Sequence, residues 1–333
     1  MTDRLSRRRF LKTCAFASAG AAAGWSIEEK MLLARAASQT KDLPRQDPKG
    51  ELPTGRIGHL KVSRLICGGN LINGYAHARD LIYVSSLMKQ YFTDEKIIDT
   101  WERCEESGIN TMISTVNDPY AGGKDPTLRV VKRYRTERGG RIQWIAQCFP
   151  RENDLTTISQ LAVDGGADGI FIQGQVGDDW GKNGRMDLIE KVVSFVKRNG
   201  LIAGVACHSI KVPKAIEKAR IGVDFYMKTL HRDDYWSVTP KAKREPDELP
   251  PHDNMWCVDS DETIEFMRAV KKPWIAYKVL AAGAIPPEQG FRYAYENGAD
   301  FLCVGMFDFQ VAEDTMIAKN VLSGVRRERP WAG

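Results

Sequence analysis

Residues 143–207 carry the pattern that determines the fold class. Three short apolar runs occur there: Gln143-Trp-Ile-Ala-Gln-Cys148, Gly169-Ile-Phe-Ile-Gln173 and Ile202-Ala-Gly-Val-Ala-Cys207. Between them lie two stretches with the apolar spacing of amphipathic helices, 154–164 and 186–198. Gly165 and Gly200 follow these stretches, at the position where glycine commonly ends a helix. This order predicts strands that alternate with helices.

The same alternation extends in both directions along the chain. Further strands are predicted at 64–67, 111–115, 224–229, 274–279 and 301–305, and further helices at 94–106, 125–137, 211–219, 261–271, 287–297 and 311–322. Eight strand–helix units predict an α/β fold, a single (β/α)8 TIM barrel over residues 55–333, and not two doubly wound halves. Residues 55–62 precede the first strand, and we expect an N-terminal hairpin or plug there, across the bottom of the barrel.

Two connections are long for such a barrel. They are residues 70–92 after the first strand and residues 230–258 after the sixth. Both leave the C-terminal ends of strands, where these barrels hold their chemistry. We therefore expect the two loops to cover a site.

The composition is that of an ordinary globular protein. The chain has 333 residues, 43% of them hydrophobic and 27% charged, and its mean hydropathy is −0.37. These values exclude disordered, collagen-like and disulfide-scaffold proteins. No stretch has the roughly eighteen uncharged apolar residues of a spanning helix, which excludes a polytopic membrane protein.

The first 36 residues differ from the rest of the chain. Ser6-Arg-Arg-Arg-Phe-Leu-Lys12, a weakly apolar stretch from Ala15 to Trp25, and Ala34-Arg-Ala36 together resemble a twin-arginine signal peptide. Residues 37–54 are polar, contain three prolines and are expected to form a linker. We therefore expect a bacterial protein that the twin-arginine export machinery carries to the periplasm or another extracytoplasmic space, with no membrane attachment after cleavage.

The net charge of +5 is concentrated in the predicted signal. That segment holds seven of the 48 basic residues and three of the 43 acidic residues, which leaves 41 basic and 40 acidic residues elsewhere. A nearly neutral remainder lacks the basic surface that nucleic-acid binding requires, so no nucleic-acid partner is expected. The six cysteines beyond the signal form no C-x-x-C pair and no zinc-type spacing, and we interpret them as small buried side chains.

Two segments resemble the aldo/keto reductases. Gly55-Arg-Ile-Gly-His-Leu-Lys-Val-Ser-Arg-Leu65 is similar to the G-R-x-G-L-K-V-S-R-L opening of that family, and Glu106-Ser-Gly-Ile-Asn110 is similar to the entry of its second strand. The strand order is similar over residues 55–324. Four further stretches resemble a group of exported barrels related to these reductases; they begin at Tyr75, Lys228, Trp274 and Val304. The resemblance implies a barrel fold and export.

The catalytic residues of the reductases do not carry over. The positions of the family's aspartate, lysine and histidine fall on Ile113, on Cys148 or Gln147, and on Gln173. Tyr120 can still correspond to the family's tyrosine, but a tyrosine with a pKa of roughly 10 is a poor acid without those partners. The exit of the eighth strand, residues 308–314, is acidic where NADP-dependent members carry Arg or Lys. The cofactor therefore stays unknown; a nicotinamide dinucleotide and a divalent metal are both possible, and neither is favoured.

Polar residues at the C-terminal ends of the predicted strands form the candidate site. The candidates for substrate binding are Asn70, His77, Arg79, Gln147, Gln173, His252, Asp253 and Asp308. The candidates for catalysis are His208, Lys228, His231 and Lys278. A polar ring of this kind suits a hydroxyl-rich small molecule.

The two lysines allow three interpretations. Desolvation and mutual repulsion would lower their pKa values and favour Schiff-base or acid–base chemistry on Lys228 or Lys278. The pair would otherwise bind a substrate oxygen electrostatically. The third interpretation is structural, with each lysine neutralising an acid such as Asp308 or Asp224.

The histidines and aromatic residues also have alternatives. His208 and His231, with Asp308 or Asp253, would suit a divalent metal, but no H-x-x-x-H spacing supports one and no metal ligand is assigned. Tyr235, Trp236 and Trp256 suit either stacking on a sugar face or packing of their loop against the barrel.

Three hypotheses about function follow. The first is an exported enzyme that acts on a small carbonyl or carbohydrate-like substrate by acid–base or lyase chemistry. The second is an oxidoreductase with a nicotinamide cofactor loaded before export. The third is a non-catalytic ligand-binding barrel on a reductase-like scaffold.

Overall fold

The computed structural model describes residues 50–75, 77, 81, 83–119, 125–244 and 255–333. The predicted signal, most of the predicted linker, and Arg79, Tyr120, His252 and Asp253 lie outside the described residues. Within those ranges, no helix has the length and apolar content needed to cross a membrane.

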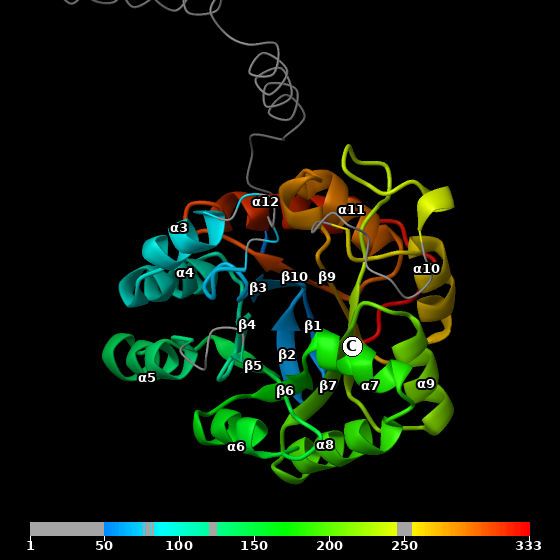
Figure 1. Ribbon diagram of the computed structural model, residues 1–333. Helices are drawn as coiled ribbons and strands as arrows, with labels where there is room; N and C mark the ends of the chain where they lie inside the picture. Colours follow the sequence, from blue (N-terminus) through cyan, green and yellow to red (C-terminus); the bar gives the residue numbers. More distant parts are fainter. Residues whose placement is uncertain (1–49, 76, 78–80, 82, 120–124, 245–254) are drawn as a thin grey trace, which may run out of the picture. The chain divides into compact units, whose positions relative to one another are not determined.

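Eight parallel strands close into a barrel (Figure 1). They are β3 (Leu65–Gly68), β4 (Thr111–Thr115), β5 (Gln143–Cys148), β6 (Gly169–Ile172), β7 (Ile202–Cys207), β8 (Phe225–Thr229), β9 (Trp274–Tyr277) and β10 (Phe301–Gly305). The barrel closes because β10 pairs with both β9 and β3. The predicted (β/α)8 architecture is confirmed.

Helices surround the barrel (Figure 1). Those that the sequence predicted are α4 (Asp94–Glu106), α5 (Thr127–Arg138), α6 (Thr157–Asp164), α8 (Met186–Arg198), α9 (Lys211–Ala219), α10 (Ser260–Ala269), α11 (Pro287–Glu296) and α12 (Val311–Gly324). The structure adds α3 (Tyr83–Tyr91) in the loop after β3 and α7 (Gly174–Lys182) after β6. Two short 3-10 helices, η2 (Lys241–Lys243) and η3 (Ala281–Gly283), follow β8 and β9.

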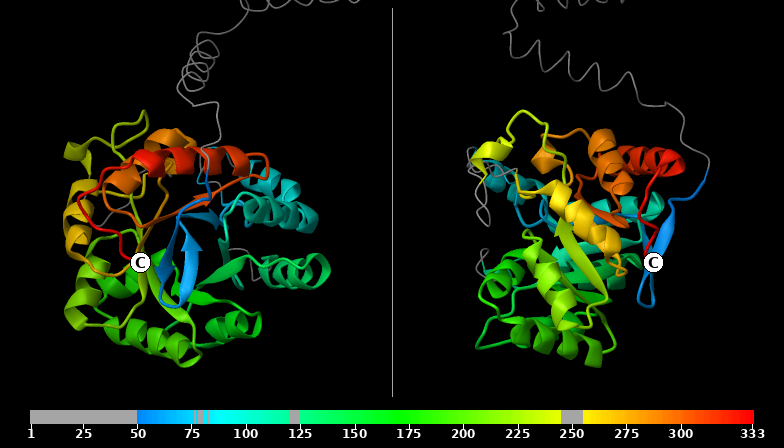
Figure 2. Two further views of the ribbon diagram at one scale, coloured as in Figure 1. Left: turned by 180° about the vertical axis from the view of Figure 1, so that it is seen from behind. Right: turned by 90° about the vertical axis from the view of Figure 1, so that its right-hand side faces the viewer.

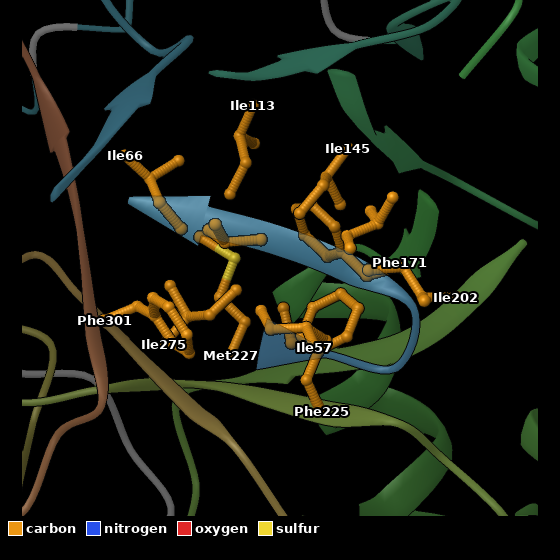
Figure 3. Close-up of a cluster of buried hydrophobic side chains, with 13 residues drawn as sticks. Ile57, Ile66, Ile113, Ile145, Phe171, Ile202, Phe225, Met227, Ile275 and Phe301 are labelled. Carbon is orange, nitrogen blue, oxygen red and sulfur yellow. The ribbon is translucent and has the colours of Figure 1, made fainter. Parts of the chain in front are cut away.

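A hairpin closes the N-terminal end of the barrel, as predicted. Its strands, β1 (Thr54–Ile57) and β2 (Leu60–Ser63), pair antiparallel around a turn at Gly58, whose φ of +57° favours glycine. Figure 3 shows the hairpin surrounded by side chains from the barrel strands. Ile57, Leu60 and Val62 belong to the same buried cluster as interior residues of the barrel. The hairpin therefore fills one end and leaves the other for chemistry.

The chain's C-terminus lies at the same end as the hairpin (Figure 2). Asp300 is fully buried there and forms ion pairs with Arg327 at 3.0 Å and Arg329 at 2.5 Å. Arg64 stacks on Trp331, 4.2 Å from the ring centroid. These contacts tie the last residues of the chain across the N-terminal end of the barrel.

Helix α7 lies unusually close to β7. A Cβ atom added at Gly177 would come within 2.2 Å of the carbonyl oxygen of Ala206, so only glycine fits at this position. The segment Gly174-Gln-Val-Gly-Asp-Asp-Trp-Gly-Lys182 contains three glycines, which lower its intrinsic helix propensity. The helix therefore depends on packing against the barrel. Because its glycines make the local sequence a weak helix former, the sequence analysis did not predict α7.

The cysteines agree with their interpretation as packing residues. All six outside the predicted signal are free. Five are buried, and Cys303 is partly buried.

Candidate active site

The side chains that form the floor of the barrel mouth follow from strand periodicity. One interior layer is apolar and includes Ile66, Ile113, Ile145, Phe171, Ala206, Met227 and Ile275. Side chains alternate between the two faces of a strand, so the residue two positions further along faces the interior one layer closer to the mouth. That next layer comprises Gly68, Thr115, Gln147, Gln173, His208, Thr229 and Tyr277. The floor of the mouth is therefore mainly polar.

Two glutamines of this layer hold their neighbours. The Gln147 amide donates to Thr115 Oγ1 at 2.9 Å. Gln173 is the N-cap of α7, and its Oε1 accepts from the backbone N–H groups of Gln175 and Val176 at 2.8 and 3.1 Å. Gln147 thus stays a candidate for binding, while the carbonyl of Gln173 is used to begin α7.

His208 is held by Asp178 of α7. Its Nδ1 donates to Asp178 Oδ2 at 2.7 Å, and Asp178 also accepts from the backbone N–H groups of His208 and Ser209. Burial lowers the pKa of His208 below its ordinary value; the bond to Asp178 offsets part of this effect, and the charges of Lys278 and Lys228 add to it. His208 is therefore a neutral imidazole near pH 7, with Nε2 as its basic nitrogen.

Trp256 contacts three of the predicted site residues. Its ring is 4.8 Å from the ring of His208 and 5.1 Å from the ring of His77, measured between centroids. Lys278 Nζ lies over the Trp256 ring, 4.0 Å from a ring centroid. The structure thus brings together His208, Lys278 and His77 around one aromatic side chain.

Lys278 and Asn70 both contact His77. Lys278 Nζ lies 2.5 Å from His77 Nε2, and Asn70 Nδ2 lies 3.1 Å from the same atom. Because an ammonium group can only donate, Nε2 is the acceptor and the proton of this imidazole is on Nδ1. Asn70, His77 and Lys278, three of the predicted site residues, are therefore neighbours.

Tyr277 joins this group from β9, although the sequence did not indicate it. Its hydroxyl donates to the carbonyl oxygen of Cys207 at 3.1 Å, and its ring lies 5.7 Å from that of His208. Burial raises the pKa of Tyr277 well above its ordinary value. The phenol is thus a neutral, positioned hydroxyl and a weak acid.

Lys228 is buried, and protein atoms engage its ammonium group. Phe225 and Met227 of β8 face the barrel interior, so Tyr226 and Lys228 face outward, and the Tyr226 hydroxyl accordingly reaches Glu217 of α9. Lys228 is 1% exposed, and its Nζ donates to the carbonyl and hydroxyl oxygens of Thr229, each at 2.9 Å. This geometry supports a structural role.

His231 is also held by the backbone. Its Nδ1 donates to the carbonyl oxygen of Arg232 at 2.9 Å, while its Nε2 accepts from the N–H groups of Trp256 and Cys257 at 3.1 and 2.9 Å. Burial lowers the pKa of His231 to about 4. With both ring nitrogens engaged, His231 fixes the segment that carries Trp256 and is not placed for proton transfer.

Asp308 pairs away from the two lysines. It accepts from the Tyr91 hydroxyl at 2.5 Å and from Lys96 Nζ at 3.0 Å. Burial alone would raise the pKa of Asp308, but these two hydrogen bonds bring it below its ordinary value. Asp224, the other acid considered for a lysine, pairs with Lys197 at 2.9 Å. Asp308 therefore joins the loop after β10 to α3 and α4.

The metal and aromatic alternatives can be compared with the described residues, which do not include Asp253. Among the residues that the structure describes, no group of three His, Cys, Asp or Glu side chains could hold a metal ion. Trp236 is 72% exposed, whereas Tyr235 is buried and packs with Ala281 and Ile285. Trp256 contacts His77, His208 and Lys278, whereas the Tyr235 ring lies 5.6 Å from that of His231.

Asp178 is a second site residue that the sequence analysis missed, besides Tyr277. It belongs to α7, which was not predicted. The signal available was the pair Asp178-Asp179 shortly after the fourth predicted strand.

Comparisons with known proteins bear on the fold. The chain matches the structure of a candidate aldo-keto reductase from Pseudomonas aeruginosa with a TM-score of 0.55 and 15% identity, over 84% of this chain and 100% of that one. It also matches a phospho-2-dehydro-3-deoxyheptonate aldolase from Thermotoga maritima with a TM-score of 0.51 and 14% identity, over 82% and 74% of the two chains. No protein-family model and no curated protein matches the chain. At these identities the likeness is one of fold.

Proposed function

We propose that the protein is an exported enzyme that removes or adds a proton next to the carbonyl group of a small molecule. The observation that carries the proposal is the Asp178–His208 pair in the mouth, where His208 and the Lys278 ammonium group contact the same Trp256 side chain. A general base at neutral pH must be unprotonated and fixed in position. His208 meets both requirements.

Each group has a role in such a reaction. His208 Nε2 accepts the proton, and Asp178 acts as a positioning residue that holds the Nδ1–H tautomer. Lys278 stabilises the negative charge that develops on the carbonyl oxygen, because a fixed cation stabilises an oxyanion. Trp256 provides an apolar face for the substrate. This assignment keeps His208 and Lys278 from the predicted catalytic set and leaves out Lys228 and His231.

The described residues do not fit a reductase of the aldo/keto type. Ile113, at the position of the family's aspartate, belongs to the apolar interior cluster, and Cys148, at that of its lysine, is fully buried. Gln173, at the histidine position, caps α7. The exposed Glu313 lies in the first turn of α12, where a 2′-phosphate would meet like charge. We derive no step through a nicotinamide cofactor.

The test is proton exchange, which does not depend on the identity of the natural substrate. A panel of small ketones, aldehydes and sugars is incubated in D2O with the purified protein, and loss of the α-proton signal is followed by NMR. We expect exchange of at least one class, and a decrease of about 10²–10⁴-fold in H208Q, the range that a general base contributes. H59Q is the matched control, because His59 is exposed on the hairpin at the opposite end of the barrel.

Other outcomes would overturn the proposal. Exchange that is equal in H208Q and wild type would exclude His208 as the base. A stoichiometric nicotinamide dinucleotide in native mass spectra would favour the oxidoreductase. Ligand binding without exchange for any compound would favour the non-catalytic barrel.

Export is part of the proposal and rests on residues 1–36. A fusion of these residues to a reporter that is active only after folded export should depend on Arg7 and Arg8. Replacement of both by Lys should retain the reporter inside the cell. An unchanged distribution would contradict the assignment.

A further inference from the structure

Two hydrogen-bond donors converge on one atom in the mouth. Lys278 Nζ and Asn70 Nδ2 lie 2.5 and 3.1 Å from His77 Nε2. They come from opposite parts of the chain, since Asn70 follows β3 and Lys278 follows β9. The convergence therefore results from the barrel fold and not from local sequence.

The histidine nitrogen is a poor match for this pair of donors. An imidazole nitrogen has a single lone pair and no charge, so the two donors must share it. A carboxylate oxygen offers two lone pairs and a negative charge, and hydrogen bonds between charged groups are about twice as strong as neutral ones. An anionic oxygen would satisfy Lys278 and Asn70 better than His77 does.

We propose that Lys278 and Asn70 form a subsite for a carboxylate group, and that His77 occupies this subsite until a ligand displaces it. The substrate class is then a small carbonyl compound that bears a carboxylate. A carboxylate is favoured over a phosphate because two donors converge here, and a carboxylate has two oxygens to accept from them. Conversion of such a substrate rests on the proposed function, whereas binding of the carboxylate is independent of it.

The position of the subsite fits the rest of the mouth. Lys278 Nζ is 4.0 Å from the centroid of a Trp256 ring, and His208 contacts the same side chain at 4.8 Å. A small ligand held by its carboxylate at Lys278 would thus present its neighbouring atoms toward His208. Because an ammonium group has three donors, Lys278 would also donate to the carbonyl oxygen next to that carboxylate, which keeps its role in the proposed reaction. The backbone of His77 and Lys278 is left-handed, with φ of +51° and +59°, a conformation that L residues rarely adopt. Such strain is concentrated at functional sites.

The experiment measures binding by isothermal titration calorimetry on the full chain. The probes are pyruvate, its neutral methyl ester, and inorganic phosphate. The variants are K278M, which keeps the length of the side chain and removes its charge, N70A, and H77A. K132M is the matched control, because Lys132 is exposed on α5. Thermal unfolding of each variant verifies that it is folded.

We expect pyruvate to bind more tightly than its methyl ester and than phosphate. K278M should weaken pyruvate binding by about tenfold or more, because a charge-assisted bond is lost. N70A should weaken it less, K132M should leave it unchanged, and H77A should strengthen it, because a competitor for the donors is removed.

Three results would overturn the subsite. In the first, K278M and wild type bind pyruvate equally. In the second, phosphate or the ester binds more tightly than pyruvate. In the third, neither wild type nor H77A binds pyruvate. The proposed function is separable from these outcomes. If pyruvate binds but no compound exchanges its protons, the subsite is supported and the proposed enzymatic function is contradicted. If only neutral carbonyl compounds exchange, the proposed function is supported and the carboxylate subsite is contradicted.

Discussion

Protonation of His231 should destabilise the folded protein in mild acid. The neutral imidazole uses one nitrogen as a donor to Arg232 and the other as an acceptor from Trp256 and Cys257. A second proton would face two N–H donors in a site that is 1% exposed. The informative variant is H231Q, whose side-chain oxygen can still accept near the position of Nε2 but does not titrate in this range.

The magnitude follows from the difference between two pKa values. The pKa of His231 is lowered from 6.5 to about 4 in the folded state, and each unit corresponds to about 1.4 kcal/mol. Because the folded state binds fewer protons, the free energy of unfolding is unaffected above pH about 6.5 and decreases as the pH falls toward 4. His231 thus removes about 3 kcal/mol of stability over that interval.

The assay is urea denaturation at a series of pH values from 7 to 4, followed by tryptophan fluorescence. The free energy of unfolding of H231Q, relative to wild type, should rise by about 3 kcal/mol across the series. Taking this difference cancels other titrations, including that of Asp314, whose pKa burial raises to about 7. H59Q is the control, because it replaces a histidine that is exposed on the hairpin. Parallel curves for H231Q and wild type would show that the pKa of His231 is not lowered by folding.

Three further predictions concern stability and the site. D300N should cost about 3–5 kcal/mol in urea denaturation, because two buried arginines lose their counter-charge; a loss below about 1 kcal/mol would contradict this account. G177A should destabilise by about 1–3 kcal/mol, because its new Cβ would meet a carbonyl oxygen at 2.2 Å. G222A, where nothing lies within 4 Å, should have little effect, and equal losses would show that the close approach is not limiting. D178N should lower the pKa of His208 further in an NMR titration, because Asp178 is the group that raises it; an unchanged or higher pKa would contradict the assigned pairing.

The fold was predictable because each of its signals is local and repeated. The chain repeats the same signals: apolar runs of strand length, helical spacing between them, and glycines after the helices. An error in one strand–helix unit therefore does not change the predicted fold class. Helix α7 shows the limit of this reasoning. Its three glycines conceal the helix in the sequence, and Gly177 is required by contact with β7, which becomes visible only once the barrel is built. Asp178 was missed with the helix that carries it.

The candidate site was predicted less completely, because a one-residue difference decides where a side chain points. Lys228 lies within β8, one residue before its end, and strand alternation turns the base of its side chain outward. Its Nζ is held by the carbonyl and hydroxyl oxygens of Thr229. Lys278 comes one residue after Tyr277, which faces the barrel interior as Ile275 does. Its side chain would therefore also point outward if β9 continued. The strand ends at Tyr277, however, and the left-handed backbone at Lys278 breaks the alternation. The ammonium group can then reach Trp256 and His77. The two lysines share a strand parity but lie one layer apart, since Lys228 aligns with Ala276. Their different partners result from the end of β9 and the left-handed backbone at Lys278.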